Sequence, residues 1–510
     1  MTNYLLRRAL LMIPTLIGIT FLVFFIVASA PGGIGAAVLA QAGSNMTASS
    51  GVAIQRAYLE DRYGLSDPTV VQYVRWLGRI SPIKFGTRDM VLPSGDVVTA
   101  PKPAAEPPLW KKFAPEMMSA PAPAVPEFAE LNKDDRMRLF RRTERKHSDA
   151  RYAVILASGE LSSQLTAYAR AIKRDDLVLA DGQPDISKFE AHTPETENPQ
   201  WHLVAEKATA AIDTYGRSLE AFANFQGLFR ARPFEGAGVG LIPGAMYVSW
   251  PDFGTAFSSS RPVIELIPPA LLTTLTLNFV AVPIIYLVAV PSGILAAVRR
   301  GSWLDFGLGS MYIGLYSFPV VLAGVLCIGF LASKDYLGAF PVAGLHSQAG
   351  KEMAFLPCYD SAGLWQRGWL LDMMWHMALP VLCLTYTGFA VLSKQTRAAM
   401  LENFSADYVR TAKAKGVSNH DVTFAHVFRN SLIPLITIFV TVFPGMLAGS
   451  VVVERIFTIP GMGSLMIEAI NNRDVEVILA NTVMIAVVNL LALLLADFLY
   501  ALADPRVAYE

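Results

Sequence analysis

Long apolar stretches dominate the chain, and several are long enough to cross a lipid bilayer. A hydrocarbon core about 30 Å thick needs roughly 20 apolar residues in a helix. Six stretches reach this length and predict an all-α membrane protein with six transmembrane helices. They cover about residues 9–29, 268–298, 307–332, 377–398, 432–453 and 478–503.

The region between the first two spans has a different pattern and predicts a folded part outside the bilayer. Residues 53–80, 131–175 and 203–231 read as helical, and the proline- and alanine-rich stretch 98–126 reads as an extended linker. We therefore expect four regions. They are a first transmembrane helix (1–30), an extracytoplasmic helical segment (31–91), a mainly α extracytoplasmic insert with the linker (92–246), and a core domain with five transmembrane helices (247–510).

Composition supports a membrane protein and excludes some functions. Apolar residues make up 53% of the chain and charged residues 16%, below the roughly 25% of soluble domains. Basic and acidic residues balance at 42 each, which argues against a nucleic-acid partner. The cysteines Cys327, Cys358 and Cys383 have no metal-site or disulfide spacing, so we expect no metal and no cofactor.

The distribution of Lys and Arg over the short loops predicts the orientation. Short segments on one side of the predicted membrane carry eleven such residues, against five on the other side. Because basic loops stay in the cytoplasm, both termini are expected there, and residues 30–267 are expected outside.

The loop between the fourth and fifth spans is a candidate attachment site for a soluble partner. It reads "SADYVRTAKAKGVSNHDVTFAHVFRNSLIP" from Ser405 to Pro434, and Gly416 divides it into two short helical pieces. A helix held at the membrane surface can seat in a groove of a soluble ATPase and pass on its motion. Asp421 lies in the second piece and is a candidate partner for a basic residue of that ATPase; a solvated position is the alternative.

This loop resembles the EAA loop of ABC importer permeases. The resemblance rests on Arg410, Thr411, Ala412 and Gly416, followed by Pro434. Arg410 and Thr411 depart from the EAA consensus but match the dipeptide/oligopeptide branch, whose members often read "YVRTARAKG". The segments "AAVRRGSWLD", "GSVVVERIFTIPGMGSLMIEAINNRD" and "DFLYALADPRVAY" resemble the same branch in the same order. The N-terminal "LLMIPTL" and "APGG" lean toward its variant for modified peptides of the microcin C kind.

The resemblance implies a type I ABC importer permease in the bacterial inner membrane. Its expected partners are membrane lipid, a second permease subunit in a heterodimer, two ATP-binding subunits and an extracytoplasmic solute-binding protein. The expected cargo is a dipeptide, an oligopeptide or a modified peptide, and nickel remains open. The family pattern is interrupted by the insert near 92–246, for which the resemblance implies no role.

Polar residues within or beside the spans are candidates for the translocation path, since they are costly in hydrocarbon. Hydrogen bonding between helices is the alternative for each of them. In the family, the loop with "IPGMGS" turns back between the helices and faces substrate. Asp497 near the end of the last span is expected to form a structural ion pair. The candidates are Thr274, Asn278, Thr387, Pro460, Gly461 and Asn489.

The chain has no catalytic motif, and two rival functions remain. It contains no P-loop, HExxH or GxSxG, so ATP hydrolysis is expected in separate subunits and the chain is not expected to be an enzyme. A transporter driven by an ion gradient would need an ionisable path through the membrane, for which only Asp497 is available. A membrane-anchored binding protein acting through the insert is the other rival.

Overall fold

The chain forms two compact units, which we describe separately. One comprises Met1–Val27 and Phe253–Glu510, and the other comprises Ala28–Asp252. In the computed structural model, the described residues are 2–503, except 31–32, 35–58, 60–61, 65–66, 87, 94–96, 115–118, 123–131, 180–182, 195–197, 243–244, 260, 360–362, 433 and 437–450.

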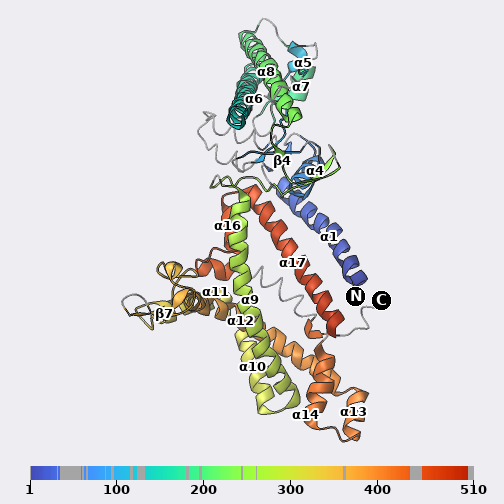
Figure 1. Ribbon diagram of the computed structural model, residues 1–510, viewed down its shortest axis with the longest axis vertical. Helices are drawn as coiled ribbons and strands as arrows, with labels where there is room; N and C mark the ends of the chain where they lie inside the picture. Colours follow the sequence, from blue (N-terminus) through green and yellow to red (C-terminus); the bar gives the residue numbers. More distant parts are fainter. Residues whose placement is uncertain are drawn as a thin grey trace. The chain divides into compact units, whose positions relative to one another are not determined.

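Four helices of the first unit are long and apolar enough to span a membrane (Figure 1). They confirm the first, second, fourth and sixth predicted spans as apolar helices, while the predicted span 432–453 lies largely outside the described residues. The four helices are α1 (Thr2–Ser29), α9 (Val263–Val298), α12 (Gly368–Phe404) and α17 (Val475–Ala503).

The predicted third span is not one continuous helix. Helix α10 (Trp303–Ser317) ends before Pro319, and α11 (Val320–Leu326) continues into the π-helical turn η2 (Cys327–Ala332) after a bend of 88°. Proline disfavours the helical conformation of the preceding residue, and Phe318 is accordingly extended, with ψ 120°. The expectation of a single helix over 307–332 is therefore wrong, although the pair together passes the same length and hydropathy criteria.

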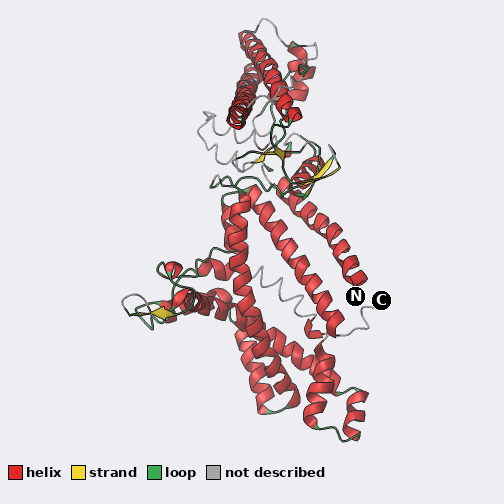
Figure 2. Ribbon diagram, viewed as in Figure 1, coloured by secondary structure: helices red, strands yellow, loops and turns green. Residues whose placement is uncertain are grey.

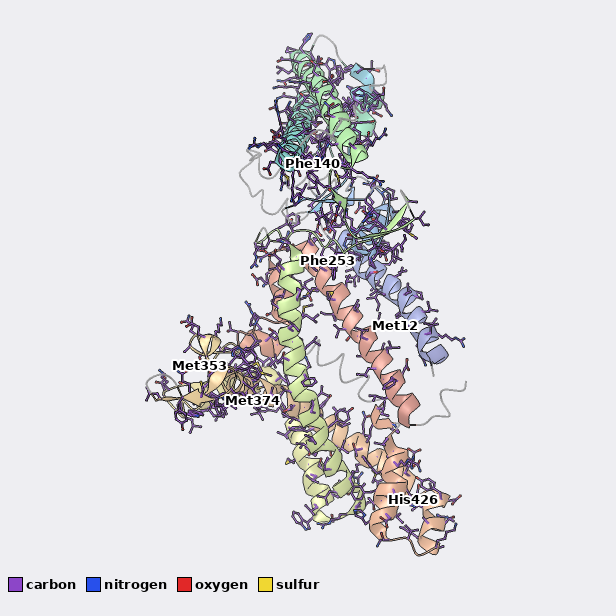
Figure 3. The ribbon with its side chains drawn as sticks, viewed as in Figure 1. Met12, Phe140, Phe253, Met353, Met374 and His426 are labelled. Carbon is purple, nitrogen blue, oxygen red and sulfur yellow. The ribbon has the colours of Figure 1, made fainter. Side chains whose placement is uncertain are left out.

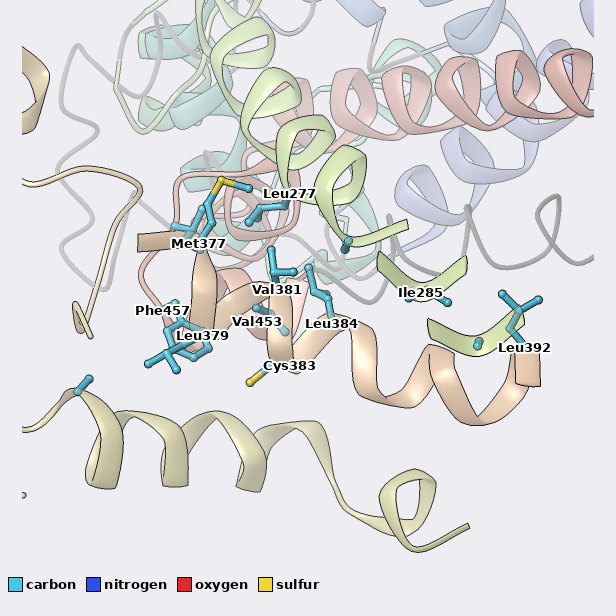
Figure 4. Close-up of a cluster of buried hydrophobic side chains, with 14 of the residues drawn as sticks. Leu277, Ile285, Met377, Leu379, Val381, Cys383, Leu384, Leu392, Val453 and Phe457 are labelled. Atoms are coloured by element: carbon cyan, nitrogen blue, oxygen red, sulfur yellow. The ribbon is translucent and has the colours of Figure 1, made fainter. Parts of the chain in front are cut away.

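Helices α9 and α12 form the centre of this unit. Their shared core includes Leu277, Ile285, Leu384 and Leu392 (Figure 4). Phe457, from the segment before α17, packs into the same cluster. At Gly293 of α9 an added Cβ would lie 2.7 Å from the Ser393 carbonyl oxygen of α12. A small residue at this point lets the two backbones approach closely, as is common between membrane helices.

The loop between η2 and α12 spans residues 333–367 and contains only short elements. It contains the 3-10 turn η3 (Gly350–Glu352) and a two-stranded hairpin of β7 (Cys358–Tyr359) and β8 (Trp365–Gln366).

The second unit is built on an antiparallel pair of long helices, α6 (Lys133–Ala171) and α8 (Pro199–Ala231) (Figure 1). Both helices begin at asparagine caps, since Asn132 accepts a hydrogen bond from the Asp135 backbone N–H and Asn198 accepts one from that of Gln200. They confirm the helices expected over 131–175 and 203–231. The shorter elements beside them are α5 (Trp110–Phe113), η1 (Asp175–Leu177) and α7 (Ile186–Ala191).

Aromatic packing ties this helix pair to neighbouring strands. Phe140 of α6, labelled in Figure 3, is fully buried and meets the rings of Phe225 and Phe234 at centroid distances of 5.5 and 5.4 Å. Met90 and Leu92 belong to the same buried cluster. The unit therefore has a core of its own.

The unit also contains short strands near one end of the helix pair (Figure 2). The sequence pattern predicts only helices and a linker in this region. Two three-stranded antiparallel sheets have the orders β1-β6-β5 and β3-β2-β4. In each sheet, strands that precede the helix pair in the sequence therefore pair with strands that follow it. Helix α4 (Thr69–Ile80) precedes the first of these strands. The strands are β1 (Ile83–Phe85), β2 (Met90–Val91), β3 (Val97–Val98), β4 (Glu235–Gly236), β5 (Val239–Ile242) and β6 (Met246–Val248).

Candidate functional site: a coupling loop and an external loop

The loop after α12 folds as the sequence predicts, with Gly416 at the division between its two helical pieces. Helix α13 (Asp407–Ala414) ends in paired hydrogen bonds, from Gly416 N to Lys413 O and from Val417 N to Ala412 O. This is the Schellman pattern, which requires a left-handed residue, and Gly416 has φ +78°. Its roles as a helix cap and as the bend of the loop coincide.

The second piece comprises α14 (Asn419–Asp421) and the π-helical turn η4 (Val422–Phe428). Ser418 caps it by accepting the Asp421 backbone N–H at 3.1 Å, and its hydroxyl donates to the Asp421 carboxylate at 2.7 Å. The hydrogen bond from Ser418 and the neighbouring His420 lower the pKa of Asp421 below its usual value. Asp421 is thus a fixed, exposed negative charge at neutral pH.

Buried side chains attach this loop to the two central helices. Val409 and Ala412 of α13 and Val422 of η4 pack with Ala297 at the end of α9 and Met400 near the end of α12. We call these five residues and their neighbour Val427 the loop-seating cluster. Because the cluster is buried, α13 and η4 are packed directly against the ends of both helices.

The remaining loop candidates lie on the surface. Arg410, Thr411 and Pro434 are exposed, and the charged end of Arg410 lies 3.6 Å from Asp407. Of the predicted loop residues, Ala412 faces inward, whereas Arg410, Thr411, Gly416 and Asp421 are available to a partner. His426, labelled in Figure 3, is six residues from His420, and no possible metal-binding group occurs among the described residues.

The loop before α17, residues 454–474, is organised by a buried carboxylate that was not among the predicted site residues. We call it the external loop, after the side of the membrane on which the sequence predicts it. Glu454 is completely buried, and its Oε1 accepts a hydrogen bond from the Thr274 hydroxyl of α9 at 2.7 Å. Its Oε2 accepts the Ser464 backbone N–H at 2.9 Å. Thr274 in turn accepts the Met462 backbone N–H at 2.8 Å. No basic side chain of the described residues pairs with Glu454, so neutral donors satisfy this carboxylate.

Glycines allow the loop to wrap around this carboxylate. A Cβ at Gly461 would overlap the carboxyl group of Glu454, and a Cβ at Gly463 would lie 2.9 Å from its Oε2. Gly461 immediately precedes α16 (Met462–Asn471). Two of the predicted path residues, Thr274 and Gly461, therefore belong to one buried network, which we call the Glu454 network.

Asparagines on the flanking helices support the same loop. Asn278, four residues after Thr274, donates to the Thr274 carbonyl at 2.8 Å, and Asn481 of α17 donates to the Met462 carbonyl at 2.9 Å. The side-chain carbonyls of both asparagines are buried and make no hydrogen bond within the described residues.

The other predicted path residues lie elsewhere. Thr387 of α12 and Asn489 of α17 are half-buried, and Pro460 is exposed. None of these three has a hydrogen bond to the Glu454 network in the described part of the chain. Asp497 forms the expected ion pair, with its Oδ2 3.4 Å from Nε of Arg8.

A sequence signal for Glu454 was present. It is a charged residue directly after the apolar run "GSVVV", where an unpaired acid would be costly. Its partner Thr274 is 180 residues earlier, so no local pattern shows the pair.

The comparisons with known proteins match the half of the chain that carries these loops. The family model for the inner membrane component of binding-protein-dependent transport systems matches residues 289–509. The oligopeptide transport system permease protein AppB of Bacillus subtilis is 38% identical over 51% of this chain and 76% of its own. The permease protein YejB of Escherichia coli O157:H7 is 35% identical over 51% and 68%.

One more sequence relative and one solved structure are similar to part of the chain. The di/tripeptide transport system permease protein DppB of Pseudomonas aeruginosa is 35% identical over 51% of this chain and 74% of its own. A solved MetNI methionine ABC transporter chain aligns with a TM-score of 0.37 at 15% identity, over 48% of this chain and 99% of that chain. The assignment therefore rests on the sequence relatives. This chain belongs to the family of binding-protein-dependent transport system inner membrane components, and it is an ABC transporter permease subunit, a multi-pass inner membrane protein that works with separate ATP-binding subunits.

Proposed function

We propose that this permease imports peptides, and that its coupling loop drives the transport motion through α9. The names of the relatives cover oligopeptide and di/tripeptide transport, so peptide cargo follows from the family branch. The observation that carries the mechanism is the loop-seating cluster, which joins α13 and η4 to the ends of α9 and α12.

Helix α9 contacts both loops. Ala297 near its C-terminal end belongs to the loop-seating cluster, and Thr274 belongs to the Glu454 network. The two residues are 23 positions apart, which corresponds to about 35 Å at 1.5 Å per residue, roughly the thickness of a bilayer. A displacement of the coupling loop by the ATPase then moves the external loop through one helix.

The complete transporter needs further components. We propose a type I arrangement with six spans in this chain, a second permease subunit, and an extracytoplasmic solute-binding protein. Both termini and the coupling loop face the cytoplasm, as the excess of Lys and Arg in the short segments of that side favours. In this arrangement the binding protein selects the cargo, so it decides among dipeptides, oligopeptides and modified peptides.

The path residues divide into two kinds under this proposal. Thr274 and Gly461 position the external loop through a hydrogen bond and a close contact with Glu454, and the Asn278 amide N–H donates to the Thr274 carbonyl beside them. Thr387 and Asn489, which have no such bonds to the network, are the better candidates for contact with cargo.

Reversing the charge of Asp421 tests the coupling role. Asp421→Lys places a cation where the proposed ATPase groove meets an anion, and we expect ATP-dependent peptide uptake in proteoliposomes to fall at least about tenfold, as for loss of a charged interface pair. The matched control is Lys334→Glu, an exposed reversal in the loop between η2 and α12, which should retain uptake.

Two measurements separate the explanations. Co-purification of the ATP-binding subunits reports docking, and uptake without ATP but with an ion gradient reports a gradient-driven carrier. Full uptake and docking by Asp421→Lys would contradict the role of this residue, while gradient-driven uptake would contradict the proposed function itself.

A further inference from the structure

A cavity of about 520 Å³ opens between α9, α10 and α12, outside both loops described above. Its lining includes Ala296 of α9, Asp305 of α10, and Lys394 and Arg397 of α12. Ala296 directly precedes Ala297 of the loop-seating cluster, so the cavity lies on the same side of the unit as the coupling loop. An ABC permease turns that side toward the cytoplasm, where its ATP-binding subunits are.

The charges around this cavity leave an excess of positive charge. The Asp305 carboxylate is fully engaged by Arg397, through a pair of hydrogen bonds of 2.7 and 2.8 Å. Lys394 is exposed and forms no ion pair with a described residue. Arg299 and Arg300, in the turn between α9 and α10, are also exposed. The neutralised pair therefore forms a rigid wall, and Lys394 supplies an unneutralised cation.

Buried hydroxyl groups lie at the inner wall of the cavity. Tyr312 is 3% exposed and donates to Ser292 at 2.8 Å, and the hydroxyls of Ser292 and Ser393 lie 3.1 Å apart. Tyr312 and Ser393 both line the cavity. A polar inner wall beside a cation suits a phosphate or glycerol headgroup better than an apolar side chain.

The side of the cavity formed by α10 is apolar and open. Phe306 and Ile313, seven residues apart on one helix face, are 79% and 53% exposed. Gly309 lies between them, and a Cβ there would meet nothing within 4 Å, which leaves a groove along the helix. Trp303, 81% exposed at the start of α10, is a residue type enriched where membranes meet water.

We propose that this cavity binds an anionic phospholipid of the cytoplasmic leaflet. The headgroup phosphate lies beside Lys394 and Ser393, and an acyl chain follows α10 past Gly309 between Phe306 and Ile313. Basic pockets between membrane helices on the cytoplasmic side are a known mode of headgroup recognition. The inference rests on the family assignment for its side of the membrane and is independent of the cargo.

Lipid-dependent thermal stability of the purified transporter complex in detergent, with this chain at full length, tests this site. Phosphatidylglycerol should stabilise the protein at lower concentration than phosphatidylcholine does. Lys394→Gln should weaken the phosphatidylglycerol effect about fivefold, the contribution expected of one basic residue near an anionic surface. Gly309→Leu fills the groove without changing charge and without a backbone clash, so it should weaken the effect as well.

Matched controls separate specific binding from general attraction. Arg7→Gln removes an exposed charge near the N-terminus and should leave the lipid response unchanged. Equal responses to both lipids, or an unaltered response of Lys394→Gln, would overturn the proposal. Stabilisation by inorganic phosphate alone to the same extent would assign the cavity to a free anion. Loss of the second permease subunit on Gly309→Leu, with the lipid response intact, would assign it to a protein interface.

Discussion

Glu454 is the residue on which the external loop depends. A buried carboxylate is costly unless its oxygens are hydrogen-bonded, and here a hydroxyl and a backbone N–H satisfy them without a basic partner. The same hydroxyl, that of Thr274, also accepts a backbone N–H of the loop, so three segments of the chain converge on two side chains.

Glu454→Gln tests this arrangement. The amide has one acceptor oxygen where the carboxylate had two. Its –NH2 group therefore faces either the Thr274 hydroxyl, which must give up its donation and turn to accept, or the Ser464 N–H, which loses its acceptor. We expect a loss of about 1–3 kcal/mol in the free energy of unfolding, measured by denaturant titration in detergent. Glu468→Gln, an exposed neighbour on α16, should change it by less than about 0.5 kcal/mol. Equal effects of the two substitutions would show that the network contributes nothing.

Gly416→Ala tests the bend of the coupling loop. A Cβ meets no atom within 4 Å there, so the cost comes from the positive φ alone, about 1 kcal/mol. We expect looser attachment of α14, measured as faster amide hydrogen exchange in residues 418–428, and slower ATP-dependent uptake. Gly307→Ala is the control because its site is equally open but lies within α10. Unchanged exchange in Gly416→Ala would contradict the requirement for glycine.

At the scale of elements, helices α9 and α12 extend beyond the apolar spans that the sequence predicts. Helix α12 is longer than the predicted span 377–398 at both ends, and its first turns contact the loop between η2 and α12. Oδ2 of Asp372 there accepts the Ser347 backbone N–H at 2.8 Å, and Nδ1 of His346 lies 3.7 Å from the same oxygen. The His346 ring packs against the Trp369 ring, with the centroids 4.6 Å apart and the planes tilted by 32°.

The burial of His346 predicts a pH dependence of the loop between η2 and α12. Burial lowers the pKa of His346, with Asp372 opposing and His376 and Lys351 adding to the shift. The unfolded chain therefore binds a proton near pH 6.5, before the native chain does, and stability falls as the pH falls through that value. His346→Gln should flatten the dependence of the unfolding temperature between about pH 7.5 and 5.

An exposed histidine provides the comparison. His202→Gln on α8 should leave the slope as it is, since its side chain is exposed. A slope that survives His346→Gln undiminished would place the titration in another group.

At the scale of the whole molecule, we expect the second unit to be an addition to the membrane permease. Its core is formed within residues 28–252, and the relatives cover only about half of the chain. Strands β1 and β6 pair, and the Gly86 N–H donates to the Ala245 carbonyl at 3.0 Å. The chain therefore leaves and re-enters the sheet at neighbouring points, as a tolerated insertion requires.

Excision of residues 87–244, replaced by a short glycine-rich turn, tests this organisation. We expect the membrane part to assemble with its ATP-binding subunits and to keep ATP-dependent uptake of peptide. The measurements are co-purification and uptake in proteoliposomes. A correctly assembled but inactive protein would favour action through the insert, and thus the membrane-anchored binding protein considered from the sequence.

Local patterns in the sequence determined the elements. Runs of apolar residues are a property of one segment, so α1, α9, α12 and α17 could be predicted, as could α6 and α8. The coupling loop was also predictable, because its glycine and its flanking helices lie within a dozen residues. The family branch followed from motifs of the same short range.

Only the tertiary structure decided which segments meet. Thr274 and Glu454, or Gly86 and Ala245, are distant in the chain, and no periodicity links them. The strands of two to four residues carry too few positions for an alternating pattern, so their pairing with distant partners defines them. The sequence shows a proline at position 319, but the mean hydropathy of residues 307–332 does not reveal that the helix bends there. Burial and hydrogen bonding between remote residues therefore supply what the linear pattern lacks.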